Sequence, residues 1–341
     1  MGVDLGELFT KESCGFKDFK ERVIVLDAHN ILHQFLSSIR QRDGTPLKDS
    51  QGRITSHLSG LLYRTAHMVE TKIRPVYVFD GQPHPLKART IRQRRQRKEQ
   101  AEREWKEALE KGDLETAKSK AQQTSRVTSE IIKQSKQLLE ALGIPFIQAP
   151  SEGEAQASYM VQRADAYAVG SQDFDCLLFG APILVRNLTS SERRKLPSKQ
   201  AYTSVHPERI NLESGLQRLG VSREQLVDIA LLVGTDFNDG IKGYGPKKSL
   251  KLLKEKGRLE QALDVLPEPR LSSDEIETLR KIFLEPTVST DYSLQWQKTD
   301  PDTVIRLLCD EYQFSRERVK PVLEHFSLFH EMTKQKNLFD F

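Results

Sequence analysis

Two short apolar runs that each end in aspartate, residues 22–27 (RVIVLD) and 75–80 (PVYVFD), decide the fold of this chain. Such runs are typical of strands buried on both faces of a sheet. Residues 28–40 and 56–71, which lie between them, have helical spacing. This order predicts an α/β fold with a central, mostly parallel sheet flanked by helices, whose carboxyl edge carries the site. Four later runs are predicted to complete the sheet: residues 144–148, 166–169, 183–187 and 201–205.

Acidic residues follow several of these predicted elements. Residues 150–154 (PSEGE) and 173–175 (DFD) each carry two carboxylates two residues apart, and Asp236 follows a predicted helix at 225–233. Buried like charges repel each other strongly unless a cation lies among them. The pattern therefore predicts a site for divalent metal formed by seven acids: Asp27, Asp80, Glu152, Glu154, Asp173, Asp175 and Asp236.

Ordinary structural roles explain some of these acids one at a time. Asp27 is placed to cap the following helix, and Asp80 with Gly81 is a turn-forming pair. Ser151 and Glu154 have the spacing of a capping box, which leaves Glu152 unexplained. The metal hypothesis therefore depends on whether all of these acids converge.

A strongly basic segment follows the second aspartate-terminated run. Residues 87–98 hold seven basic residues and no acidic one. Helical spacing continues to about residue 142, with a break at residues 112–113, and predicts two long helices that project from the sheet. A charged run is usually a solvated helix face, which accounts for about half of this segment. Unbalanced positive charge beside acids suits a polyanion that must be drawn past them.

Glycines and lysines alternate at residues 240–248 (GIKGYGPKK), just after Asp236. Glycines let the backbone approach a phosphate, Pro246 suits a first helical position, and the helix start offers free N–H groups and two lysines. An ordinary turn between helices has the same pattern. Beside an acidic site and a basic arm, the segment is predicted to hold a duplex backbone without regard to sequence.

Composition narrows the class of protein. The chain has 341 residues, 37% of them hydrophobic, and a net charge of +4. We find no apolar run long enough for a membrane span and no signal-peptide pattern. Three scattered cysteines, Cys14, Cys176 and Cys309, argue against zinc and against a disulfide framework. We expect a monomeric protein of the cytoplasm, or of the nucleus if the source is eukaryotic.

Six ordered motifs resemble the flap endonucleases, particularly the archaeal type, along the whole chain. They are MGV at 1–3, VLDAHN around Asp27, VFDG around Asp80, APSEGEAQA at 149–157, SQDFDCLLFG at 171–180 and GTDFNDGIKGYGPKK at 234–248. The resemblance implies a single 5′ nuclease domain at 1–331, with a helical arch at about 82–135 and a helix-two-turn-helix motif at about 225–257. A tail that binds a sliding clamp is implied at 332–341.

The resemblance also implies the cofactors and the catalytic side chains. Two Mg²⁺ ions, which Mn²⁺ can replace, are expected at the acids. One is held chiefly by Asp27, Asp80, Glu152 and Glu154, and the other by Asp173, Asp175 and Asp236. Lys87 and Arg94 are expected to reach the scissile phosphate, and K⁺ is expected at the helix-two-turn-helix motif.

Contacts with DNA and with a clamp are implied in the same way. The DNA-binding residues are expected to be Gly2, Arg40, Arg64, Glu152, Gly234, Asp236, Gly243, Gly245, Lys247 and Lys248. His33 stands where many relatives carry a Tyr that stacks on a base, and histidine stacks less well. The clamp is expected to bind Gln335, Leu338, Phe339 and Phe341, although only Phe341 fills the paired aromatic position. A frayed tail is the alternative.

The implied activity is cleavage of a 5′ flap near its junction with duplex DNA, together with 5′–3′ exonuclease activity, in Okazaki-fragment maturation and base excision repair. A relative that cuts bubbles, or that acts as an exonuclease, is the alternative. A D-x-D phosphatase with Asp173 as the nucleophile would leave the basic segment idle. A non-catalytic junction-binding protein would not need so many acids.

Overall fold

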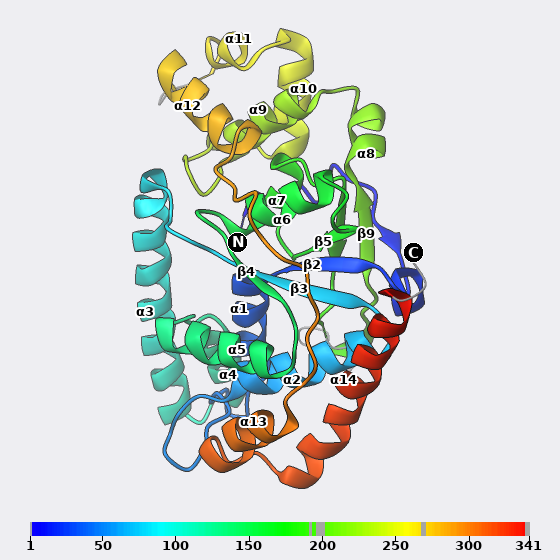
Figure 1. Cartoon of the computed structure of the whole chain (residues 1–341). Coiled ribbons are helices and arrows are strands. Elements are labelled where there is room, and N and C mark those ends of the chain that lie inside the picture. The colour runs from blue at the N-terminus through cyan, green and yellow to red at the C-terminus, as the bar shows by residue number, and fades with distance from the viewer. Residues whose placement is uncertain (1, 191–192, 196–201, 267–270, 338–341) are drawn as a thin grey trace.

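The centre of the molecule is a seven-stranded sheet in the order β1-β9-β6-β5-β2-β3-β4. The computed structural model describes residues 2–190, 193–195, 202–266 and 271–337. Strands β2 to β6 are parallel, as predicted, and Figure 1 shows helices on both faces of the sheet. The bounds are β1 Glu12–Ser13, β2 Val23–Asp27, β3 Arg74–Phe79, β4 Phe146–Gln148, β5 Ala168–Gly170, β6 Ile183–Arg186 and β9 Glu208–Asn211.

One predicted strand does not join this sheet. The run at 201–205 forms β8 (Tyr202–Ser204), which pairs with β7 (Arg193–Lys195) in a separate two-stranded sheet. Strand β9 takes its place and pairs antiparallel with β6. The sequence of β9, ERIN, has a single apolar residue, Ile210, which is fully buried. The local sequence correctly predicted a strand at 201–205. It could not show that this strand pairs with β7 and not with the central sheet.

Two hydrophobic clusters cover the faces of the sheet. One face packs against α1 (Ala28–Ser38), α2 (Ser56–Glu70), α5 (Ser129–Ala141), α13 (Pro301–Ile305) and α14 (Arg316–Asn337). The other cluster extends from the opposite face through α6 (Gly153–Gln162), α7 (Asp175–Leu178), α8 (Leu212–Leu219), α9 (Arg223–Val233), α10 (Pro246–Lys256), α11 (Leu259–Leu263) and α12 (Ser273–Leu284). None of the described helices combines the length and the apolar character that a membrane span needs.

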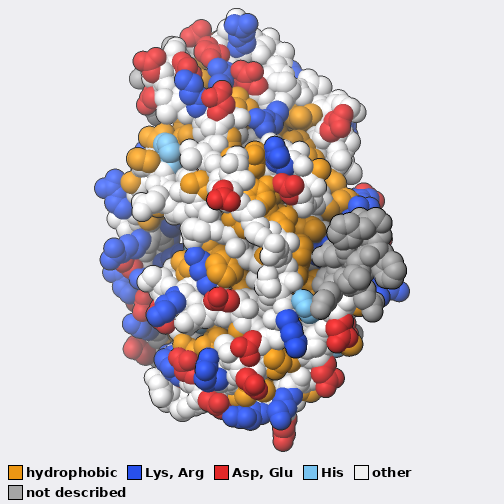
Figure 2. Space-filling view, viewed as in Figure 1, with side chains coloured by type: hydrophobic (Ala, Val, Ile, Leu, Met, Phe, Trp, Pro, Cys, Tyr) orange, Lys and Arg blue, Asp and Glu red, His pale blue; other side chains and the backbone are white. Residues whose placement is uncertain are grey.

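The basic segment forms one long helix and two shorter ones, where two long helices were predicted. Helix α3 (Ala88–Glu110) has 23 residues, α4 (Leu114–Gln122) has 9, and α5 has 13. Thr128 caps α5 by accepting from the N–H of Ile131, which starts a new helix after a non-helical linker. Helices α3 and α4 pack together along one edge of the molecule, and Lys and Arg side chains gather on that edge (Figures 1 and 2).

Candidate active site

The two aspartate-terminated strands bring their carboxylates to the same edge of the sheet. Asp27 is the last residue of β2, and Asp80 follows β3 directly. The parallel register places Asp27 beside Val78, two residues before Asp80. Asp27 also caps α1, because its Oδ1 accepts from the backbone N–H of Asn30 at 3.0 Å. The capping role and a place in the acidic cluster therefore coexist in one residue.

The other five acids reach this edge from three further segments: the start of α6, the connection from β5 to α7, and the loop after α9. Glu152 is the N-cap residue of α6 and Glu154 lies in its first turn. No side chain caps this helix, so the predicted capping box is wrong, and Glu154 is left for another role. Asp173 and Asp175 lie between β5 and the first turn of α7, and Asp236 follows α9.

The acids lie close enough to oppose one another's ionisation. Asp27, Asp175 and Asp236 are 4%, 3% and 8% exposed. Burial, followed by the charge of Asp80, raises the pKa of Asp27 to about 8. Burial, followed by the charge of Asp173, raises the pKa of Asp175 to about 7. The expected convergence is therefore present, with the like-charge repulsion that it entails.

Two cations from the base of α3 lie against these carboxylates. Lys87 donates to Oε2 of Glu152, and its Nζ is 3.7 Å from Oδ2 of Asp236. Arg94 donates to Oδ1 of Asp236. Burial alone lowers the pKa of Lys87, but the charges of Glu152 and Asp236 outweigh it and raise the pKa. Both predicted phosphate-binding residues therefore lie at the cluster.

The donor set fits hard divalent cations, because Mg²⁺ and Mn²⁺ prefer carboxylate oxygens. Within the described part of the chain, no group of three or more His, Cys, Asp or Glu side chains is arranged to hold a metal ion. Instead, Lys87 and Arg94 hold Glu152 and Asp236 by ion pairs. The pKa values of Asp27 and Asp175 stay raised beside these cations, chiefly by burial and then by the neighbouring acids.

Hydrogen bonds from neighbouring residues orient the aspartates. The side-chain amide of Asn30 donates to Oδ2 of Asp173 at 2.9 Å. Ser171 donates to Oδ2 of Asp27 at 3.3 Å and accepts from the N–H of Asp173 at 3.2 Å. Neither Asn30 nor Ser171 was predicted as a site residue, although Asn30 lies in the motif around Asp27 and Ser171 in the motif at 171–180. Contacts across more than 140 residues leave no local signal.

Glycine is required where the N-terminal segment meets the cluster. The backbone N–H of Val3 donates to Oδ1 of Asp175 at 2.7 Å. A Cβ added to Gly2 would lie 2.3 Å from that carboxyl group, which no real side chain tolerates. Gly153 is constrained in the same way, since its N–H donates to Asp80 and its Cβ would lie 2.6 Å from Oδ1 of Asp80. Gly2 therefore lies directly beside the acidic cluster.

Comparison with known proteins identifies the family. Residues 7–101 match the XPG N-terminal domain and residues 143–236 match the XPG I-region. Flap endonuclease 1 of Methanothermobacter thermautotrophicus is 53% identical over 326 residues, which cover 96% of this chain and 96% of that protein. The chain belongs to the flap endonuclease family. Flap endonuclease 1 of Thermococcus onnurineus is 50% identical over 340 residues, with 99% of this chain and 98% of that protein covered.

Solved structures agree with the fold of this flap endonuclease. Flap endonuclease-1 from Methanococcus jannaschii matches with a TM-score of 0.76 and 40% identity, covering 96% of this chain and 98% of that one. The catalytic core of Rad2 in complex with a DNA substrate matches with a TM-score of 0.69 at 24% identity, covering 94% and 97%, and shows the fold alone. The chain is thus a metal-dependent nuclease with the 5′ nuclease fold.

The glycine-rich loop of this flap endonuclease joins α9 to α10 as predicted. Gly234 has a φ of +104°, and a Cβ there would lie 2.6 Å from the N of Gly240, so the turn needs glycine. Gly243 also has a positive φ, +86°, and Lys248 donates to its carbonyl at 3.2 Å. Gly245 caps α10, and the exposed Lys247 lies 3.3 Å from Glu7. The loop begins at the carboxylate cluster, because Asp236 lies in it three residues after the end of α9, and it leads from there to α10.

Arg40 and Arg64 do not join the acidic cluster. Arg40 lies beyond the C-terminal end of α1, a helix about 16 Å long that begins next to Asp27. It donates to the carbonyls of Leu36 and Gly44, and so holds the turn after the helix. Arg64 is half-buried on α2.

His33 lies on α1, one helical turn from His29, and its Nδ1 is 3.4 Å from Oγ of Ser125. Burial, with the nearby charge of Lys98, lowers its pKa to about 3. His33 is therefore neutral at physiological pH.

The predicted clamp-binding residues lie outside the part of the chain that the structure describes. Helix α14 runs to Asn337, but the side chain of Gln335 is not described, and Leu338, Phe339 and Phe341 lie outside the described residues.

Proposed function

We propose that this flap endonuclease hydrolyses DNA at the junction of a 5′ flap, using two Mg²⁺ ions bound at the carboxyl edge of the sheet. One ion would be held chiefly by Asp27, Asp80, Glu152 and Glu154, and the other by Asp173, Asp175 and Asp236. Such ions, when bound, supply an activated water and stabilise the leaving oxygen. The observation that carries the proposal is the convergence of these acids with two cations from the base of the arch.

Lys87 and Arg94 are proposed to stabilise negative charge on the scissile phosphate. Each already contacts a carboxylate of the cluster, so a phosphate that enters beside those acids meets both cations. The positive charge of Lys87 acts strongly there because its side chain is only 17% exposed and lies away from bulk water. Asn30 and the backbone N–H of Val3 keep Asp173 and Asp175 oriented while the phosphate binds.

The duplex is proposed to lie across α9, α10 and the loop between them. The start of α10 presents free N–H groups and lysines, which suit phosphate oxygens and read no sequence. K⁺ would bind the backbone of this loop. Gly2, Arg40, Arg64, Gly234, Gly243, Gly245, Lys247 and Lys248 would contact the DNA, together with Glu152 and Asp236. The 5′–3′ exonuclease activity and the roles in Okazaki-fragment maturation and base excision repair belong to the same proposal.

The test is cleavage of end-labelled DNA in Mg²⁺, compared among a 5′ flap, a bubble, a blunt duplex and a single strand. We expect metal-dependent cutting near the flap junction. Asp173→Ala should abolish cleavage and largely spare binding, whereas Asp291→Ala, at an exposed acid away from the site, should change neither. Equal cutting of bubbles would favour a bubble-cutting relative. Loss of DNA binding together with loss of the fold in Asp173→Ala would mean that the acids are structural.

The tail is proposed to bind a sliding clamp. The enzyme itself is proposed to be a monomer. The support is the sequence alone, because residues 338–341 hold Leu338, Phe339 and Phe341 after Gln335. Deletion of residues 332–341 should abolish stimulation of cleavage by the clamp and leave cleavage without the clamp unchanged. Unchanged stimulation would show that the clamp binds elsewhere.

A further inference from the structure

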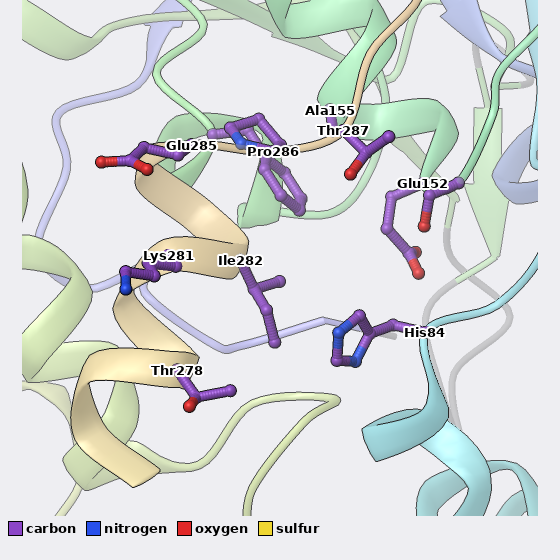
Figure 3. Close-up of a pocket in the computed structure, with 11 residues that line it drawn as sticks. His84, Glu152, Ala155, Thr278, Lys281, Ile282, Glu285, Pro286 and Thr287 are labelled. Carbon is purple, nitrogen blue, oxygen red and sulfur yellow. The ribbon is translucent and has the colours of Figure 1, made fainter. Parts of the chain in front are cut away.

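A pocket of about 250 Å³ opens beside the carboxylate cluster. It lies where the N-terminus of α6, the linker between β3 and α3, and the end of α12 meet. Ile282 and His84 lie on opposite sides of this space, and Glu152 extends into it from α6 (Figure 3). Glu152 therefore belongs to both places, because its Oε2 also accepts from Lys87. The proposed metal and phosphate contacts leave the pocket itself without a role.

The pocket has an apolar wall and a polar rim. Its wall is formed by Ala155, Phe179, Ile282 and Pro286. On the rim, Nδ1 of His84 accepts from the N–H of Leu86 at 3.3 Å, so the ring proton is on Nε2, which can donate. The hydroxyl of Thr278 donates to the carbonyl of Asp274 at 2.8 Å and keeps its lone pairs for a ligand donor. The rim thus offers both a hydrogen-bond donor and hydrogen-bond acceptors beside the apolar wall.

These features fit a flat, uncharged ring with polar edges. Glu152 and Glu285 both line the pocket and disfavour an anion such as phosphate. The ammonium of Lys281 is not free to offset them, because it lies 2.7 Å from Glu277 on the outer face of α12. The volume is slightly below the 300–1,000 Å³ or so typical of pockets for drug-sized ligands. A single nucleobase meets these limits of size, charge and edge chemistry, whereas a whole nucleotide does not.

We infer that this pocket binds one unpaired nucleobase of the 5′ flap, within a few nucleotides of the cleaved bond. The inference rests on the proposed function, which places the scissile phosphate at Lys87 and Arg94. A contiguous row of side chains joins the two places. The Nζ of Lys87 lies 5.1 Å from the ring centre of Phe237, and the ring of His84 meets that of Phe237 edge-on at 5.8 Å.

The base must be unpaired because a paired base has its polar edge and both ring faces occupied in the duplex. The pocket therefore helps the enzyme to distinguish a flap from a nicked duplex. A base held there would also fix the position of the flap relative to the carboxylates. It would do so without selecting a sequence, since every base offers a flat ring to the apolar wall.

The direct test is a scan of the flap with abasic sites. Flap DNAs that lack one base, at each of the first four flap positions and at the first paired position, are compared with the intact flap. Binding is measured in a chelator and cleavage in Mg²⁺. We expect one flap position at which loss of the base weakens binding roughly 5- to 30-fold, in line with the contribution of one stacked base. The same substrate should show a raised KM with little change in kcat.

Two variants of α12 separate the pocket from general effects. Ile282→Trp fills the space, so it should weaken binding of the intact flap by a similar factor and make the scan flat. Asp274→Trp adds the same ring at an exposed position of α12 whose side chain does not line the pocket, and it should keep the position-specific effect. Thermal unfolding checks that both variants are folded, and the scan on the wild-type enzyme stands even if Ile282→Trp is not.

A flat scan with the wild-type enzyme would overturn the inference, as would a persistent position-specific effect in folded Ile282→Trp. These results are distinct from failure of the proposed function. If flap DNA is cut at the junction but the scan is flat, only the pocket assignment fails. If one position matters for binding but no DNA is cut, the base site is supported and the proposed catalytic mechanism fails.

Discussion

Replacing Lys87 with methionine removes the charge that lies between two carboxylates and keeps an unbranched side chain. In the wild-type enzyme, the Nζ of Lys87 lies 3.7 Å from Oδ2 of Asp236 and also donates to Glu152. The three side chains are 17%, 11% and 12% exposed, so water screens the pairs only weakly. An ion pair at ~4 Å is worth ~4 kcal/mol near a protein surface, and removing one partner of a buried pair costs about 3–5 kcal/mol. We expect Lys87→Met to lower the free energy of unfolding by that amount in a chelator.

Mg²⁺ should return most of this stability, because a divalent ion supplies positive charge to the same carboxylates. The measurement is denaturant-induced unfolding of the wild-type and variant enzymes, each in chelator and in excess Mg²⁺. Lys106→Met, on the helix α3 that follows Lys87, is the matched control. Lys106 is 67% exposed and lies 3.4 Å from Glu102, and such exposed pairs contribute less than about 1 kcal/mol.

Cleavage should not recover with stability. Without the ammonium at the phosphate, kcat of Lys87→Met should fall by about 100- to 1,000-fold even in saturating Mg²⁺. An equal loss of stability with and without Mg²⁺ would refute the reasoning, since it would show that Lys87 supports the fold independently of the carboxylate charges. A kcat close to that of the wild-type enzyme would remove Lys87 from the catalytic step.

Asn30→Leu should raise the Mg²⁺ concentration needed for half-maximal cleavage by about 10- to 100-fold, because Asp173 loses its donor, and unchanged Mg²⁺ dependence would count against a positioning role. Gly2→Val should cut activity sharply with little change in thermal unfolding, because its Cβ meets the carboxyl of Asp175, and full activity would disprove this close approach. Burial lowers the pKa of His57 to about 4, whereas in the unfolded chain it is about 6.5. As the pH drops below 6.5, the unfolded state therefore takes up the proton before the folded state does, and the free energy of unfolding decreases. The expected loss from pH 7.5 to 5 is about 2 kcal/mol in denaturant titrations, and His57→Gln should lack this component.

The sequence predicted the sheet and the acidic site because both depend on short, local patterns. Two apolar runs end in Asp27 and Asp80, and parallel strands share a carboxyl edge. These two facts were enough to predict that the two carboxylates lie at the same edge of the sheet. The break between α4 and α5 was missed because charged residues continue a helical pattern through a linker, while the capping hydroxyl of Thr128 starts a new helix. Strand β9 was missed because an edge strand with one buried residue carries almost no periodic signal.

The pocket and the orienting hydrogen bonds could not be predicted for a different reason. His84, Glu152 and Ile282 come from three separate segments, and only the tertiary structure brings α12, the N-terminus of α6 and the linker between β3 and α3 around one pocket. Asn30 reaches Asp173 across 143 residues. Motifs mark where side chains that do chemistry occur, whereas the groups that position them depend on tertiary contacts.

The carboxylates at the sheet edge are oriented largely by backbone donors and by neighbouring side chains. Asp175 accepts from the N–H of Val3, Asp80 from that of Gly153, and Asp27 from that of Asn30. A backbone N–H stabilises a carboxylate without adding a full positive charge, so it fixes orientation and leaves most of the negative charge in place. Burial, and then the neighbouring acids, raise the pKa values of Asp27 and Asp175, so the site lacks the positive charge that would keep both ionised. The sequence therefore builds a site that is ordered in geometry and still short of positive charge, which is the condition under which added cations bind most strongly.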